Sequence, residues 1–156
     1  METGNSYNYP PNNVRVTQAL AALIAGDKSS FYNCNFLGFQ DTLLDAKGRH
    51  YFKSCFIAGG VDFIFGAGQS IYEGCTISVI EGVIDNRLAG FITAQGRTSP
   101  NDTNGFVFKR CKITGAREAY LGRAWGAYAR VIYFKSVYEA TIVPQGWDSF
   151  SSTGKE

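Results

Sequence analysis

The chain lacks the features that mark membrane-spanning, signal-bearing or metal-binding proteins. No apolar run approaches the roughly 20 residues that a bilayer-spanning helix needs, and the first residues, METGNSYNYPPNN, are too polar and turn-rich for a signal peptide. The four cysteines include no C-x-x-C pair, so zinc-ribbon and thioredoxin-like sites are not expected. The only histidine, His50, stands in GRHYF, with no G-x-S-x-G elbow anywhere, and we expect it to be an exposed turn residue.

The charge pattern also excludes partners. The net charge is +2, and the lysines and arginines are scattered rather than gathered in a basic arm, so neither a nucleic-acid nor a membrane partner is expected. FGAGQS lacks the spacing of a nucleotide-binding glycine loop, so no nucleotide site is predicted. The 156 residues, 45% of them hydrophobic, are enough for one domain over residues 1–156.

An internal repeat is centred on the cysteines. Four segments share the pattern aromatic-x-x-Cys-x-apolar: FYNCNFLG, FKSCFIAG, YEGCTISV and FKRCKITG. The first three cysteines, Cys34, Cys55 and Cys75, are 20 or 21 residues apart, and Cys111 follows after a longer gap. A short strand that recurs at this period indicates a solenoid.

We predict an all-β chain that folds as a parallel β-helix, with the small cysteine side chains facing inward. An antiparallel sandwich of short strands is the less favoured alternative. The segment TQALAALIAG, residues 17–26, has helix propensity, but its distance from the next repeat leads us to predict a strand there.

Two carboxylates occupy the same phase of consecutive repeats. Asp41 lies seven residues after Cys34, and Asp62 lies seven residues after Cys55. Same-phase residues of a β-helix stack about 4.8 Å apart, and two carboxylates that close cannot both ionise easily. One can therefore act as an anionic nucleophile and the other as a proton donor. The plainer interpretation is that each Asp makes a turn.

The other copies do not extend this pair. The third copy has Gly82 at the equivalent position, and the fourth has Glu118, which we expect to be a solvated surface residue.

The neighbours of the pair bear on its chemistry. A retaining glycosidase also uses two carboxylates about 5 Å apart, whereas ester cleavage needs donors for an oxyanion. Gln40, directly before Asp41, and Gln18, upstream, are neutral amide donors. Adjacent strand residues face opposite sides, so Gln40 and Asp41 can share a site only if the chain bends there.

Five ordered blocks resemble the pectin methylesterases (pectinesterases). They are GFQDTL at 38–43, GGVDFIFG at 59–66, TAQGRTSPNDTNGFVFKRCKI at 93–113, LGRAW at 121–125 and VPQGWDSF at 143–150, so the resemblance runs from about 18 to 150. It implies a right-handed parallel β-helix. It also implies hydrolysis of galacturonate methyl esters in pectin, with release of methanol and without a metal or cofactor.

The resemblance assigns roles by matching motifs. Asp62 is the implied nucleophile, and Asp41 is the implied acid and then base. Gln40 and Gln18 are the implied oxyanion donors. The implied substrate-binding residues are Arg123, Trp125 and Trp147, although plain packing is an equal alternative for Trp147.

The chain also departs from the family pattern. It has Gly60 where the family commonly has Thr, and Ala124 where Pro is common. Family domains are about twice as long, so we expect a β-helix that is incomplete at both ends. Family disulfides match either Cys55 with Cys75 or Cys75 with Cys111, and buried free thiols are equally expected.

The resemblance implies a secreted cell-wall protein that acts on pectin, with a proteinaceous pectinesterase inhibitor as a further partner. Two alternatives stay open. One is a non-catalytic pectin-binding remnant of a truncated esterase, and the other is a β-helical polygalacturonate hydrolase or lyase.

Overall fold

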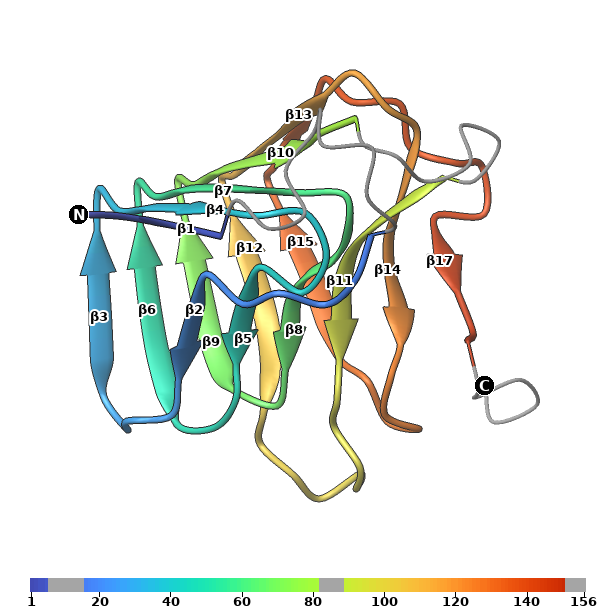
Figure 1. Cartoon of the computed structure of the whole chain (residues 1–156). Coiled ribbons are helices and arrows are strands. Elements are labelled where there is room, and N and C mark those ends of the chain that lie inside the picture. The colour runs from blue at the N-terminus through green and yellow to red at the C-terminus, as the bar shows by residue number, and fades with distance from the viewer. Residues whose placement is uncertain (6–15, 82–88, 151–156) are drawn as a thin grey trace.

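The chain winds into a solenoid of three parallel sheets. A computed structural model describes residues 1–5, 16–81 and 89–150. Successive strands visit the three sheets in strict rotation, so each coil adds one strand to every sheet (Figure 1). Within the described residues every regular element is a strand. The prediction of an all-β, right-handed parallel β-helix is confirmed.

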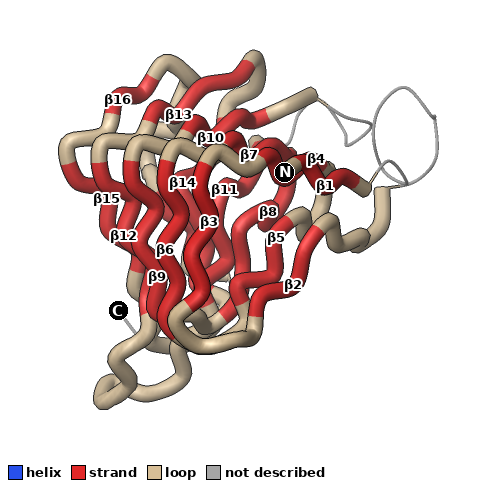
Figure 2. Tube along the Cα trace, turned by 90° about the vertical axis from the view of Figure 1, so that its left-hand side faces the viewer, coloured by secondary structure: helices blue, strands red, loops and turns tan. Residues whose placement is uncertain are grey.

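The three sheets, named here A, B and C, form the sides of the coil, as the view along the stack shows (Figure 2). Sheet A contains β1 (Glu2–Gly4), β4 (Asn35–Leu37), β7 (Phe56–Gly59), β10 (Thr76–Val79), β13 (Lys112–Gly115) and β16 (Val137–Tyr138). Sheet B contains β2 (Ala22–Ile24), β5 (Leu43–Asp45), β8 (Val61–Gly66), β11 (Gly90–Gln95), β14 (Ala119–Ala124) and β17 (Trp147–Asp148). Sheet C contains β3 (Ser29–Tyr32), β6 (Arg49–Lys53), β9 (Gln69–Glu73), β12 (Gly105–Lys109) and β15 (Val131–Phe134).

The aromatic position of the repeat forms a stacked ladder in the core. Rings of adjacent coils lie 4.6 to 5.0 Å apart, nearly parallel, which is one strand spacing per ring. The ladder runs through Phe31, Phe52, Tyr72, Phe108 and Tyr133. Its last member, Tyr133, belongs to a fifth copy of the repeat, YFKSVY. Ser136 replaces the cysteine in this copy, so an alignment on cysteines does not detect it. The Ser136 hydroxyl accepts a hydrogen bond from the backbone N–H of Cys111.

The four cysteines lie where sheet C turns into sheet A, and all are buried free thiols. The residue before each turns the corner with a positive φ, for example 51° at Asn33 and 53° at both Ser54 and Arg110. Only Gly74 is a glycine among these corner residues, and its φ is 61°. The corner therefore tolerates several residue types, because single residues can adopt the left-handed conformation.

Two expectations about local structure are tested directly. Residues 17–26 contain the strand β2 rather than a helix, because pairing of Ala22–Ile24 with β5 outweighs the local propensity. The prediction that His50 is an exposed turn residue is wrong. His50 lies within β6, 4% exposed, and its Nδ1 is 2.6 Å from Oδ1 of the buried Asp45. The Tyr72 hydroxyl donates to the other oxygen of Asp45.

Candidate active site

A cavity of 160 Å³ opens on the outer face of sheet B. Phe65, Ala94 and Arg123 are in register on β8, β11 and β14, and they point away from the core. The described residues that line the cavity are Gln18, Gln40, Asp41, Asp62, Phe65, Ala94, Arg123, Trp125 and Phe150. Of the seven residues predicted from sequence, all except Trp147 line this cavity.

Both aspartates stand at the corner where sheet A turns into sheet B. The backbone φ is 61° at Asp41 and 48° at Asp62, in the left-handed region that single Asp residues tolerate. The backbone N–H of Asp41 donates to the carbonyl of Val61, and Gln40 bridges to Val61, so the two corners stack in adjacent coils. This bend removes the strand alternation that would have separated Gln40 from Asp41, and both side chains reach one cavity.

The environment of Asp41 favours its protonated form. Burial and the neighbouring charge of Asp62 raise the pKa of Asp41 to about 6, and the hydrogen bond from Gln18 and the charge of Arg123 oppose that rise. At pH 6 roughly half of the Asp41 side chains therefore hold a proton, and roughly nine-tenths do at pH 5. A carboxylic acid that keeps its proton near neutrality is suited to general acid catalysis.

Asp62 has a different partner. Nε of Arg123 donates to Oδ1 of Asp62 over 2.8 Å, and Nη2 of Arg123 donates to Oδ2. The pKa of Asp62 is raised overall. Burial is the largest cause, the hydrogen bonds and charge of Arg123 counter it only in part, and the charge of Asp148 adds to the rise. The bidentate pair therefore supports the anion at Asp62, while Asp41 has no such partner among the described residues.

Two aromatic rings hold the Arg123 guanidinium. Its central carbon lies 4.5 Å from the ring centre of Phe91 and 4.4 Å from that of Phe150. Phe150 has a φ of 50°, and its backbone N–H donates to the Asp148 carboxylate over 2.7 Å. The turn thus carries the Phe150 ring over Arg123.

Sequence reasoning missed three of the lining residues: Phe65, Ala94 and Phe150. Phe65 and Phe150 lie inside the quoted blocks GGVDFIFG and VPQGWDSF, but only the polar and Trp positions of these blocks were singled out.

Trp125 is half exposed and its ring lies 6.0 Å from that of Phe65. Trp147 instead lies beside Tyr133, with 6.1 Å between the ring centres, so its sugar-stacking role stays a prediction.

Smaller expectations have mixed outcomes. Glu118 is exposed, as expected, and Gly82 lies outside the described residues. The glycine at position 60 has a steric reason, because a Cβ there would lie 2.5 Å from the tip of the Phe39 ring.

Among residues 1–5, 16–81 and 89–150, no cluster of three or more His, Cys, Asp or Glu is placed to hold a metal ion. None of the described residues forms a helix able to span a membrane.

The chain matches a known protein family. The Pectinesterase family model matches residues 12–155, which is most of the chain. The chain belongs to the pectinesterase family. It is 53% identical to Probable pectinesterase 29 of Arabidopsis thaliana and 52% identical to Probable pectinesterase 55 of the same plant, over 97% of its own length in each case.

Solved structures carry the same pectinesterase fold. The pectin methylesterase from carrot superposes with a TM-score of 0.86 at 32% identity, over 95% of this chain and 47% of the carrot chain. The enzyme from Aspergillus niger superposes with a TM-score of 0.83 at 35% identity, over 94% of this chain and 47% of that one. The chain spans about half the length of the curated relatives that it matches, 47% for each of the two plant relatives named above.

Proposed function

We propose that this chain hydrolyses methyl esters of galacturonate in pectin, releasing methanol and leaving de-esterified pectin. The observation that carries the proposal is the pair of stacked carboxylates in one cavity, of which one is ion-paired with Arg123 and the other has a pKa of about 6. Membership of the pectinesterase family supports the same substrate class. No metal or cofactor takes part in the proposed mechanism.

In the first step, an oxygen of the Asp62 carboxylate attacks the carbonyl carbon of the ester. The carbonyl oxygen becomes an oxyanion, which accepts hydrogen bonds from the side-chain amides of Gln18 and Gln40 in the same cavity. When the tetrahedral intermediate collapses, the methoxy group leaves and takes the proton of Asp41, so methanol departs as a neutral molecule. The galacturonyl group is then held on Asp62 as an anhydride.

In the second step, Asp41 acts in the opposite direction. Its carboxylate takes a proton from water, and the resulting hydroxide attacks the galacturonyl carbonyl. The bond to Asp62 breaks, the carboxylate of Asp62 returns to its ion pair with Arg123, and Asp41 is again protonated for the next cycle.

The surroundings of the cavity suit a polymer. A second hollow of 480 Å³ shares Trp125 and is lined by Leu44 of β5, by Gly66 of β8 and by Gly96, which directly follows β11. Residues of the first hollow and this one form one surface on sheet B, so a chain of sugars can continue beyond the reacting ester. A solved pectin methylesterase, 22% identical and similar in fold, is described in complex with a hexasaccharide. We further propose a cell-wall location and, as a second partner, a proteinaceous pectinesterase inhibitor.

The direct test is methanol release from highly esterified pectin by the chain and by three variants. Asp62→Asn and Asp41→Asn are expected to lower kcat at least 100-fold, because one removes the nucleophile and the other the acid. Asp27→Asn, which changes an exposed carboxylate in the turn between β2 and β3, outside the cavity, is the matched control and is expected to keep activity within twofold.

The products separate this proposal from its alternatives. Methanol without new reducing ends supports the esterase, whereas new reducing ends indicate a hydrolase and unsaturated uronides indicate a lyase. Methanol formation that is equal in the Asp62→Asn variant and the unaltered chain would overturn the proposed mechanism. Binding of pectin with no product of any kind would favour the non-catalytic remnant.

A further inference from the structure

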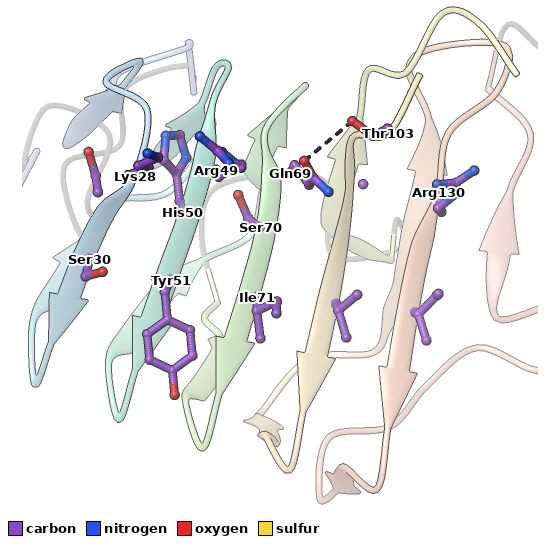
Figure 3. Close-up of a pocket in the computed structure, with 14 residues that line it drawn as sticks. Lys28, Ser30, Arg49, His50, Tyr51, Gln69, Ser70, Ile71, Thr103 and Arg130 are labelled. Carbon is purple, nitrogen blue, oxygen red and sulfur yellow. Dashed lines mark hydrogen bonds between the residues drawn. The ribbon is translucent and has the colours of Figure 1, made fainter. Parts of the chain in front are cut away.

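The outer face of sheet C carries a second groove, on a different side of the solenoid from the candidate active site. It has a volume of 560 Å³ and is lined from all five strands of the sheet, so it runs along the solenoid axis across the strands. Figure 3 shows Arg49, Gln69, Thr103 and Arg130 following one another along one edge, with Tyr51 and Ile71 further along their strands.

The middle of the groove is an apolar row one residue wide. Strand register places Tyr51, Ile71, Val107 and Ile132 directly beside one another on consecutive strands. Ile71 is 43% exposed and Ile132 is 49% exposed, although neighbouring positions on the same strands point into the core. The spacing from one member of the row to the next is about 4.8 Å.

Polar donors form the edge beside the apolar row. Gln69 is in register with Arg49 on one side and Gly105 on the other, and its side-chain oxygen accepts from the Thr103 hydroxyl over 3.4 Å (Figure 3). The amide N–H₂ group of Gln69 is left to donate. Gly105 contributes no side chain, and Arg130 packs against it, since a Cβ on Gly105 would lie 3.1 Å from Cδ of Arg130.

Cations stand at both ends of this edge. Lys28 and Arg49 lie at one end, and Arg130 lies at the other. Three strand spacings, about 14 Å, separate β6 from β15, and four, about 19 Å, separate β3 from β15. Arg49 is paired with Asp27 at 2.5 Å, whereas Lys28 and Arg130 form no ion pair with any residue in the described part of the chain. The backbone N–H of Arg130 donates to the side-chain oxygen of Gln95, which fixes this end of the groove.

The lining of the groove is basic. Its described residues include three basic side chains, Lys28, Arg49 and Arg130, and no acidic one. The candidate active site, in contrast, contains two aspartates and one arginine. An anionic ligand is therefore attracted to sheet C rather than to the cavity on sheet B.

We propose that this groove binds a linear polyuronate, an unbranched polysaccharide that bears one carboxylate on each sugar. The C–H faces of the sugar rings pack on the apolar row, the sugar hydroxyls accept from the Gln69 amide and donate to the Thr103 hydroxyl oxygen, and the carboxylates reach Lys28 and Arg130. A long, narrow groove with an apolar floor and cations at its ends matches a ribbon-like chain with both apolar faces and regular negative charge. Such binding would hold the protein on an anionic polymer independently of catalysis at Asp62.

The experiment is an NMR titration of the ¹⁵N-labelled chain with a fully de-esterified oligogalacturonate. This ligand has no methyl ester, so the result does not depend on the proposed hydrolysis. Amide shifts are expected on β6, β9 and β12, and the measured Kd is expected to rise with salt concentration. The spectrum of each variant also reports whether it is folded.

Two variants and a matched control make the test specific. Lys28→Gln with Arg130→Gln is expected to weaken binding at least fivefold. Ile71→Glu, which places a carboxylate in the exposed apolar row, is expected to do the same. The control pair Lys47→Gln with Lys112→Gln removes the same charge from exposed positions outside the groove and is expected to change Kd less than twofold.

Four outcomes would overturn the proposal. Shifts confined to β5, β8 and β14 would place the ligand at the other cavity. An equal loss in the control pair would mean that net charge alone governs binding. Equal affinity for a neutral polysaccharide would remove the role of the cations, and equal affinity for a single-stranded oligonucleotide would make the groove a general polyanion surface.

Discussion

Replacing Asp41 by Asn is predicted to stabilise the protein above pH 6 while removing the proposed acid. The pKa of Asp41 is about 6 in the folded chain, against an ordinary value of 3.8. A carboxyl whose pKa is raised by folding stabilises the native state below its unfolded value, and that contribution is lost as the pH rises through the folded value. Asn carries no proton to lose, so the variant does not share this loss.

The size of the effect follows from the shift. About two pKa units correspond to at most about 3 kcal/mol, and because Asp41 lines an open cavity, solvent screening lowers our expectation to about 1–2 kcal/mol. At 2–4 °C per kcal/mol for a chain of this size, the Tm of the variant should exceed that of the unaltered chain by roughly 4 °C at pH 7. Near pH 4 the two Tm values should converge.

The assay is thermal unfolding followed by circular dichroism at several pH values from 4 to 7.5, with the difference in Tm plotted against pH. Asp27→Asn is the control, because its ion pair with Arg49 lowers the pKa of Asp27, and its difference curve should be flat over this range. A difference that does not grow between pH 5 and pH 7 for Asp41→Asn would refute the reasoning, since it would mean that the carboxylate ionises at no cost.

Three further substitutions test other parts of the structure. Phe150→Ala removes one of the two rings on the Arg123 guanidinium and should lower kcat/KM for methanol release about two- to fivefold; an unchanged value would show that Phe91 suffices. His50→Leu leaves the buried Asp45 carboxylate without its imidazole partner and should reduce the free energy of unfolding in urea by about 3 kcal/mol. Gly66→Ala places a Cβ 2.0 Å from the Asp45 carbonyl oxygen at a φ of 122°, so a loss of at least about 2 kcal/mol is expected, and a neutral result would contradict that packing.

The architecture was predictable because each coil repeats one pattern. Alignment on Cys34, Cys55 and Cys75 gives the period, and in a solenoid the period alone determines which residues become neighbours. The stacking of Asp41 on Asp62 followed from counting seven residues from each cysteine, and the structure brings both into one cavity. The direction of the two side chains could not be predicted from the sequence. Both aspartates adopt a left-handed backbone conformation, and no glycine at these positions indicates it.

Other contacts could not be predicted from the sequence, because they depend on the path of the chain between the repeats. His50 was read as a turn residue from the preceding Gly and Arg, but the turn ends at Gly48 and β6 has already begun. Its carboxylate partner, Asp45, is the last residue of β5, and the two meet only because the corner from sheet B to sheet C folds them inward. The fifth repeat was missed because Ser136 stands in place of the cysteine on which the alignment rested.

The order of strands in sheet B offers a physical reason why the two stacked aspartates differ. Arg123 is on β14, two strands from β8, which begins beside Asp62, and three strands from β5, which follows Asp41. Its guanidinium therefore reaches Asp62 and forms two hydrogen bonds there, while its effect on Asp41 is only the smallest of the named influences on that pKa. A single cation placed off-centre along the stack thus adds to the difference between two carboxylates whose other neighbours also differ, because Gln18 bonds to Asp41 and the charge of Asp148 acts on Asp62.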